Sequence, residues 1–371
     1  MDEFNGEPGD VVRHCDRHSV HAKMPADRLR RSTISGIAIF FFGIALYTAL
    51  VVCVAAAPDW RLQTIASFAT GVQVAILFVI GHDACHGSLT PHRWLNRVIG
   101  TISFLPSWHP FSAWMHTHNG VHHVWTNVGG VDMGYPPFSK PSYDRLPPWR
   151  RIGERLLRSP LGVLAFYFFT VYFQYEMFPS RDRKPSGRAH RSFQYERFGI
   201  LVFGILLCIV STFIARWAGR PVWLAILLVL VMPSACFFSV LSFVTYLHHT
   251  HPRVPWYTQK EFNYFNMLQA TVHVEFPPLI DIVLHNILQH TAHHADMRIP
   301  LYNLRRSQEA LEIAFPDDVV RVPWSWKGYF HTVNTCRLFD YERHCWLDWD
   351  GTPTTAPLLN PQGTGGIRPA L

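Results

Sequence analysis

The sequence predicts an all-α integral membrane protein: four transmembrane helices in two hairpins, with interfacial helices and a helical cap outside the bilayer. Only 16% of the 371 residues are charged and 49% are hydrophobic, whereas soluble domains are about one quarter charged. Four segments are apolar over the roughly 20 residues that a helix needs to cross a bilayer. Polar, histidine-rich segments follow the ends of these runs, and we expect them to form the cap.

The four apolar segments are paired by short turns. Residues 33–57 and 62–81 form the first predicted hairpin, and residues 198–215 and 221–247 form the second. Residues 156–178 are also long enough to cross, but basic residues flank both ends, which is typical of a segment whose two ends lie on the same side of the membrane. We therefore predict an interfacial or re-entrant helix there.

These boundaries divide the chain into three parts. Residues 1–32 are a polar, basic N-terminal segment without the apolar core of a signal peptide. Residues 33–350 form the membrane domain. Residues 351–371 are rich in Gly, Pro and Thr, and we expect a disordered tail there.

The net charge of +7 comes largely from basic residues beside the apolar segments. Arg28, Arg30 and Arg31 precede the first segment, and a second cluster lies within residues 181–197. This is the positive-inside pattern of cytoplasmic loops and not the pattern of a nucleic-acid-binding module. We expect a multi-pass protein of a bacterial inner membrane, with its cap and active site on the cytoplasmic side.

Histidines carry the clearest chemical signal. Three short motifs with the spacings HxxxH, HxxxHH and HxxHH contain eight of the 22 histidines: His82 and His86; His118, His122 and His123; His290, His293 and His294. On a helix, residues three or four positions apart share one face, so each motif can direct two imidazoles at one point. One HxxxH pair is a weak signal, but three such motifs beside apolar segments are not expected by chance.

Imidazole binds iron, zinc, copper and nickel. Eight or nine imidazoles exceed what one four- to six-coordinate ion uses, so the motifs predict two metal ions. Asp83 and Asp296 lie next to the first and third motifs, and we expect these carboxylates to hold imidazoles in orientation. A zinc peptidase would need HExxH, which the first motif does not match.

The three motifs can share a metal site only if they lie on one side of the membrane. The first two follow the second predicted span with no span between them, so an even number of crossings must separate residue 123 from residue 290. The spans at 198–215 and 221–247 supply two crossings, provided that residues 156–178 do not cross. The charge pattern predicts the same count.

The order and spacing of the three motifs resemble those of the membrane fatty acid desaturase family. Gly81-His82-Asp83 opens the first motif, and Thr126-Asn127 follows the second. Residues 245–252, TYLHHTHP, are similar to the TYLxHTHP segment of the acyl-lipid branch that includes Δ12 and ω-6 enzymes. The resemblance covers about residues 35–350.

The resemblance implies a centre of two Fe ions with a ninth histidine outside the motifs. Residues 248–251 match the region that supplies it; we favour His249, with His251 as the alternative. It also implies O2 as co-substrate and a reaction that leaves a cis double bond in a fatty acyl chain, carried on lipid, CoA or carrier protein. The sequence contains no haem, flavin or nicotinamide motif, so we expect an external electron donor, ferredoxin or a cytochrome b5-like protein.

Three alternatives remain beside this hypothesis. The same centre can hydroxylate a fatty acyl chain, an alkane or a carotenoid, and the histidine motifs do not separate these outcomes. A metal transporter would need ligands near the bilayer midplane, and a bis-histidine haem protein would need a facing pair of histidines inside the spans.

We expect an apolar slot for the substrate beside the metals. The candidates to line it are four aromatic residues: Trp108, Phe111, Trp114 and Trp125.

Overall fold

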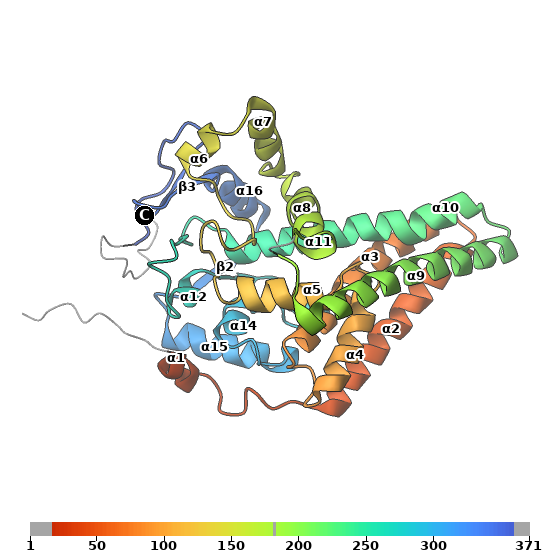
Figure 1. Ribbon diagram of the computed structural model, residues 1–371. Coiled ribbons are helices and arrows are strands. Elements are labelled where there is room, and N and C mark those ends of the chain that lie inside the picture. The colour runs from red at the N-terminus through yellow and green to blue at the C-terminus, as the bar shows by residue number, and fades with distance from the viewer. Residues whose placement is uncertain (1–16, 181–182, 360–371) are drawn as a thin grey trace, which may run out of the picture.

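The computed structural model describes residues 17–180 and 183–359 and is mostly helical. Long helices extend from one end of the molecule, and shorter elements form a cap at the other end (Figure 1). The long helices are α2 (Thr33–Ala56), α3 (Trp60–Cys85), α9 (Gly187–Trp217) and a rod made of α10 (Val222–Ile226), the π-helix η3 (Leu227–Val231) and α11 (Met232–His249).

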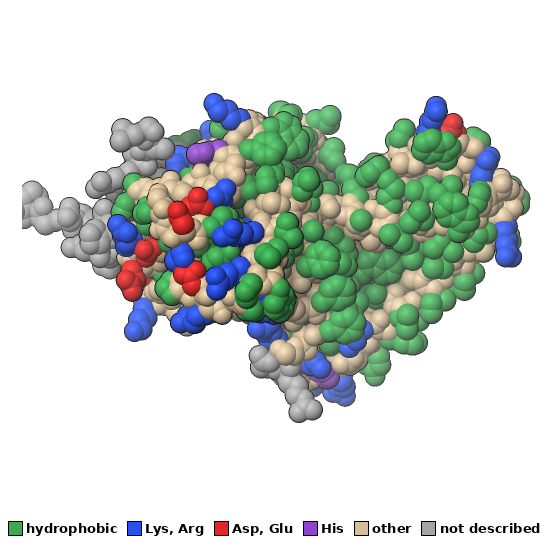
Figure 2. All heavy atoms as spheres, turned by 90° about the horizontal axis from the view of Figure 1, so that it is seen from above, with side chains coloured by type: hydrophobic (Ala, Val, Ile, Leu, Met, Phe, Trp, Pro, Cys, Tyr) green, Lys and Arg blue, Asp and Glu red, His purple; other side chains and the backbone are tan. Residues whose placement is uncertain are grey.

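Four helices are long and apolar enough to cross a membrane, which confirms the predicted number: α2, α3, α9 and the rod from Val222 to His249. Large apolar side chains on α9 point outward; Phe198 is 66% exposed and Phe213 is 72% exposed. Such exposure is expected where lipid covers the surface. Hydrophobic side chains cover much of the bundle end, whereas the acidic side chains lie mainly on the cap (Figure 2).

Two of these helices are longer than the predicted spans. Helix α3 continues to Cys85 instead of ending at residue 81, and α9 begins at Gly187 instead of residue 198. An apolar run marks only the part of a helix that lies in hydrocarbon. At 1.5 Å per residue, α9 is about 46 Å long, compared with a hydrocarbon core of about 30 Å. Its first turns carry Arg188 and Arg191 and extend beyond the apolar run.

Helix α3 is the centre of the bundle. It packs against α2, α11 and α4 (Arg93–Phe104), and 67% of its apolar window is buried, compared with 17% for α9. Gly71 permits the close approach of α11, because a Cβ at this position would lie 2.5 Å from the Cβ of Cys236. The first histidine motif lies at the end of α3 and His249 ends α11, so this packing brings two of the histidine-bearing segments together.

Residues 156–178 lie outside the four candidate spans, in agreement with the predicted count of crossings. They contain the end of α7 (Pro148–Leu157), the short helix α8 (Val163–Phe166) and the π-helix η2 (Tyr167–Met177). Helix α8 packs on α11. In Figure 1, α7 runs across the direction of the long helices, near the place where they meet the cap.

The cap is mostly helical, as predicted, but it also contains two small sheets that the sequence did not predict. Strand β1 (Val272–Glu275) pairs in parallel with β2 (Val320–Pro323), and β3 (Leu338–Asp340) pairs antiparallel with β4 (Cys345–Leu347). The helices of the cap are α1 (Arg17–Lys23), α5 (Phe111–Trp114), the π-helix η1 (Met115–His122), α6 (Lys140–Asp144), α12 (Asn266–Gln269), α13 (Pro278–Val283), α14 (His290–Ala295), η4 (Leu301–Asn303), α15 (Leu304–Ala314) and α16 (Trp326–Thr335).

The expected disordered tail differs from the structure at its start. The backbone N–H of Thr354 donates to the carbonyl of Trp346 at 2.8 Å, and that of Leu358 donates to the carbonyl of His344 at 2.8 Å. Leu359 is only 6% exposed. Backbone hydrogen bonds and a buried apolar side chain therefore hold residues 351–359 on the cap. Residues 360–371 of the predicted tail and residues 1–16 of the N-terminal segment lie outside the described residues.

Candidate metal centre

The three predicted motifs and the end of α11 meet at one place. Nine histidines form two groups, and within each group the possible ligand atoms all lie within 4.8 Å of one another. We call these the five-histidine group and the four-histidine group. The five-histidine group contains His82, His86, His118, His123 and His293. The four-histidine group contains His122, His249, His290 and His294.

The second motif lies on a π-helix, which explains its HxxxHH spacing. In η1 the backbone N–H of His123 donates to the carbonyl of His118 at 3.0 Å, five residues earlier. This wider turn puts residues 118 and 123 on one face, and both belong to the five-histidine group. His122 belongs to the four-histidine group. Short π-helical turns are often found at functional sites.

The other motifs use ordinary helical spacing. His82 lies in the last turn of α3 and His86 caps it, so both face the five-histidine group. On α14, His290 and His294 are one turn apart and belong to the four-histidine group, whereas His293 belongs to the other. Each group is therefore built from three elements, and no single helix can form either group alone.

The spacing of the ring nitrogens fits bound metal. His118 Nε2 lies 2.7 Å from His82 Nε2 and 3.1 Å from His123 Nε2, and His290 Nε2 lies 2.9 Å from His249 Nε2. With metal–nitrogen bonds of about 2.1 Å, adjacent ligands of one ion are about 3 Å apart. Three neighbouring nitrogens cannot all be satisfied by hydrogen bonds among themselves, because a neutral imidazole carries one N–H.

The protonation of the imidazoles also suits metal binding. Burial, and then the neighbouring imidazoles, hold the pKa of His118, His123 and His293 well below the usual range of histidine. Burial and the neighbouring imidazoles likewise hold the pKa of His290 and His294 well below the usual range. These rings are therefore neutral at physiological pH, and the neutral ring is the form that offers a lone pair to a metal.

The carboxylate that orients an imidazole is Asp132, which the sequence did not predict. Its Oδ1 accepts a hydrogen bond from His122 Nδ1 at 2.8 Å, which leaves His122 Nε2 free for the four-histidine group. Asp132 is 3% exposed. Burial alone would raise the pKa of Asp132, but the adjacent His122 and the hydrogen bonds to the carboxylate outweigh it and lower that pKa.

The two carboxylates that we expected in this role are held elsewhere. Asp83 accepts from Ser88 Oγ at 2.7 Å, and Asp296 accepts two hydrogen bonds of 2.8 Å from Arg298. Each carboxylate is adjacent to a motif in sequence, but its side chain does not hydrogen-bond a motif histidine among the described residues. The position of a carboxylate beside a histidine motif in the sequence therefore did not predict its contact with the imidazoles of that motif.

Thr126 and Asn127 fix two further histidines. Thr126 Oγ1 lies 3.0 Å from His294 Nδ1, and His294 Nε2 is buried without a hydrogen-bond partner among the described residues. Asn127 Nδ2 donates to the backbone carbonyl of His249 at 3.1 Å. Asn127 has a φ of 57°, a conformation that asparagine tolerates better than most residues. The segment after the second motif therefore holds one histidine ring and one histidine backbone of the four-histidine group.

Of the two alternatives for a ninth histidine, the structure brings His249 into the four-histidine group and leaves His251 outside both groups. His251 Nδ1 accepts a hydrogen bond from the backbone N–H of Arg253 at 3.1 Å. His248 also lies outside the groups, although its ring stacks on His290 with centroids 3.7 Å apart.

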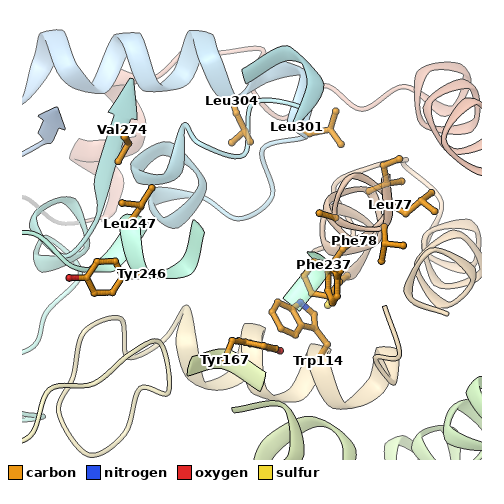
Figure 3. Close-up of a cluster of buried hydrophobic side chains, with 14 of the residues drawn as sticks. Leu77, Phe78, Trp114, Tyr167, Phe237, Tyr246, Leu247, Val274, Leu301 and Leu304 are labelled. Atoms are coloured by element: carbon orange, nitrogen blue, oxygen red, sulfur yellow. The ribbon is translucent and has the colours of Figure 1, made fainter. Parts of the chain in front are cut away.

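An apolar cavity of about 870 Å³, counted with the open space at its mouth, adjoins both groups. Its walls include Phe78 from α3, Trp114 from α5 and Tyr167 from η2, together with His118 and His249. Figure 3 shows Trp114, Phe78 and Phe237 packed together, with Tyr167 next to Trp114. The Trp114 ring also stacks on His118 with centroids 4.6 Å apart.

Of the four aromatic residues expected to line the slot, only Trp114 is among the residues lining this cavity. Trp108 packs on Phe203, and its Nε1 donates to Ser234 Oγ at 2.7 Å. Glu176 also lines the cavity, and the sequence did not predict this. Burial raises the pKa of Glu176 to about 8, and its Oε1 accepts from Thr117 Oγ1 at 2.6 Å.

Comparison with known proteins agrees with this geometry. The profile of the fatty acid desaturase family matches residues 58–326. The sn-1 oleoyl-lipid 12-desaturase of Picosynechococcus sp. is 28% identical over 80% of this chain and 83% of its own. The chloroplastic omega-6 fatty acid desaturase of Spinacia oleracea is 28% identical over 80% of this chain and 64% of its own.

A third relative, the sn-1 acyl-lipid omega-3 desaturase (ferredoxin) of Synechocystis sp., is 27% identical over 85% of this chain and 86% of its own. The family match includes the membrane helices α3 and α9 to α11 and all nine histidines of the two groups. The chain therefore belongs to the fatty acid desaturase family and is an oxidoreductase that desaturates fatty acyl chains.

Proposed function

We propose that this desaturase uses two iron ions and O2 to introduce a cis double bond into the acyl chain of a membrane lipid. The observation that carries the proposal is the position of the two histidine groups on the wall of one apolar cavity. A saturated chain offers no polar group for recognition, so a site that oxidises it needs an apolar cavity beside the oxidant.

Five imidazoles would hold one iron and four would hold the other. When bound, the irons supply the activation of O2 and the oxidising power that removes hydrogen from an unactivated methylene. One hydrogen leaves each of two adjacent carbons. With two electrons and two protons from outside, the oxygen atoms leave as two molecules of water.

The protein fixes the orientation of the imidazoles and the position of the acyl chain. Asp132 and Thr126 hold His122 and His294 through their Nδ1 atoms, so that the Nε2 atoms face the metals. Phe78, Trp114 and Tyr167 give the acyl chain an apolar wall and keep water away from it. Positioning decides which pair of methylenes reacts, because the methylenes of a chain are chemically alike.

Substrate carrier and electron donor are proposed from the relatives. Two of them are named for acyl-lipid substrates, and one name includes ferredoxin. We propose a lipid-linked acyl chain and a ferredoxin-like or cytochrome b5-like donor for this chain. Arg183, Lys184, Arg188 and Arg191 form a basic stretch at the start of α9 that would attract an acidic donor. Hydroxylation is not favoured, because the relatives named above are desaturases.

We propose that the cap faces the cytoplasm of a bacterial cell. Two cysteine variants at opposite ends of α9, Ser186→Cys and Arg216→Cys, test this orientation. In intact spheroplasts a membrane-impermeant maleimide should label Arg216→Cys, whereas Ser186→Cys should react only after lysis. Labelling of Ser186→Cys in intact spheroplasts would place the cap on the outer side.

The reaction itself is tested by the fatty acids of cells that express the chain with a ferredoxin and its reductase. We expect a new cis-unsaturated species by gas chromatography–mass spectrometry, and the fragmentation pattern of a derivative gives the double-bond position. His293→Ala should abolish the product, because it removes one of the five ligands. A new hydroxylated species in place of the unsaturated one would contradict desaturation.

The ligand assignment is tested by a matched pair of variants. His249→Ala should lower the iron content of purified protein from about two ions to about one per chain, because it opens the four-histidine group. His251→Ala should retain about two ions, because His251 lies outside both groups. Mass-spectrometric metal analysis gives the ratio. Loss of iron in His251→Ala with retention in His249→Ala would reverse the assignment.

A further inference from the structure

A second hollow lies beside the metal cavity. It measures about 1850 Å³ when the open space at its mouth is included. Helix α7, the α8–η2 segment and the loop at residues 136–142 contribute to its walls. Met133, Phe166 and Val171 line both this hollow and the metal cavity. The two hollows therefore adjoin at these three apolar side chains.

The hollow opens beside a helix that suits a membrane surface. On α7, Trp149, Ile152 and Leu156 are 69%, 60% and 63% exposed, and they recur at helical spacing along one side. Arg151 and Arg155 are also on this short helix. An exposed apolar stripe beside basic residues is typical of a helix that lies in the headgroup region of a bilayer. The orientation of α7 across the long helices fits this position (Figure 1).

The charges of the hollow fit a headgroup with at most one negative charge. Among the described residues that line it, the cations are Arg150 and Arg158. Arg158 is 5% exposed and is engaged by the carbonyl of Pro136 at 2.6 Å and by Glu154 at 3.3 Å. Arg150 is exposed and lies over the Trp149 ring.

The other polar groups in the lining are mostly neutral. Ser142, Gln174, Tyr175 and Gln259 offer hydroxyl and amide groups for hydrogen bonds. A carrier with several phosphates, such as CoA, calls for a cluster of cations, because each phosphate is best recognised by charge-assisted hydrogen bonds. A glycerolipid presents only ester carbonyls and either sugar hydroxyls or one phosphodiester.

We propose that this hollow is a vestibule that holds the headgroup and glycerol backbone of a glycerolipid while the acyl chain passes between Met133, Phe166 and Val171 to the metal cavity. The inference rests on the proposed function, because it takes the metal cavity to be the place of reaction. The lipid enters sideways from the bilayer surface, so it never has to leave the membrane.

Gly153 offers a direct way to fill the vestibule. It lies on α7, lines the hollow, and a Cβ there would meet nothing within 4 Å. Gly153→Trp therefore adds bulk to the vestibule from a position with open space at the Cβ, and it removes a glycine from a helix. Ile313→Trp is the control, because Ile313 on α15 is 83% exposed and neither lines the hollow nor belongs to the apolar stripe of α7.

Gly153→Trp should lower kcat/KM for desaturation of a membrane glycerolipid by at least about tenfold, with the iron content of the wild type. Ile313→Trp should stay within about twofold of wild type. Wild-type activity in Gly153→Trp would overturn the vestibule while leaving desaturation intact. Absence of product from the wild type itself would instead count against the proposed function.

A binding measurement tests the vestibule without any turnover. In purified iron-loaded Gly153→Cys, maleimide labelling at residue 153 is followed by peptide mass spectrometry, which separates it from the native cysteines. Mixed micelles containing dioleoyl phosphatidylglycerol or dioleoyl monogalactosylglycerol should slow labelling at least about fivefold relative to micelles of detergent alone. Oleoyl-CoA should not slow the labelling of Gly153→Cys. Arg145→Cys, which is exposed and does not line the hollow, should label equally in all cases.

Protection by both lipids would assign recognition to the glycerol diester, and protection by the phosphoglycerolipid alone would assign it to the phosphodiester beside Arg150. Protection by the galactolipid alone would assign it to the sugar hydroxyls. Each of these results supports a glycerolipid vestibule. Equal labelling with and without lipid, or protection by oleoyl-CoA as strong as that by the lipids, would overturn it.

Discussion

The convergence of nine imidazoles from four segments, eight of them buried, is the constraint on which the rest of the structure depends. Their ring nitrogens approach to 2.7 Å and 3.1 Å without enough N–H groups to satisfy one another. A buried polar atom without a partner costs about 1–3 kcal/mol, and cations shared by these nitrogens would remove that cost. The segments that carry the histidines must also end on one side of the membrane. Two hairpins meet this requirement, and an odd number of spans between the second and third motifs would not.

The local backbone is adapted to bring the histidines of the two groups together. Helix η1 takes an i→i+5 turn, so that one short motif serves both groups. After it, Asn127 adopts a positive φ and the chain returns Asp132 to His122. Gly134 leaves room for that ring, because a Cβ there would lie 3.1 Å from His122 Cε1. The surroundings of the site therefore hold rings in place, and the apolar cavity beside them is the proposed position of the acyl chain.

Much of this arrangement was predictable from the sequence, because transmembrane helices and histidine motifs depend on short-range patterns. The four membrane helices and the family are confirmed. What failed depends on long-range geometry. Asp83 and Asp296 are next to motifs in sequence but hydrogen-bond to Ser88 and Arg298, whereas Asp132 reaches His122 only because of the turn at Asn127. Helix α9 begins before the predicted span at 198–215, because hydropathy marks only the part of a helix that lies in hydrocarbon. The short strands of the cap are too brief to show a period.

We propose that the two histidine groups are two separate iron sites. An anomalous difference map collected at the iron absorption edge, from crystals of purified protein, tests this claim most directly. Two peaks are expected, one surrounded by His82, His86, His118, His123 and His293 and the other by His122, His249, His290 and His294. A single peak shared by both groups, or peaks away from these histidines, would contradict it.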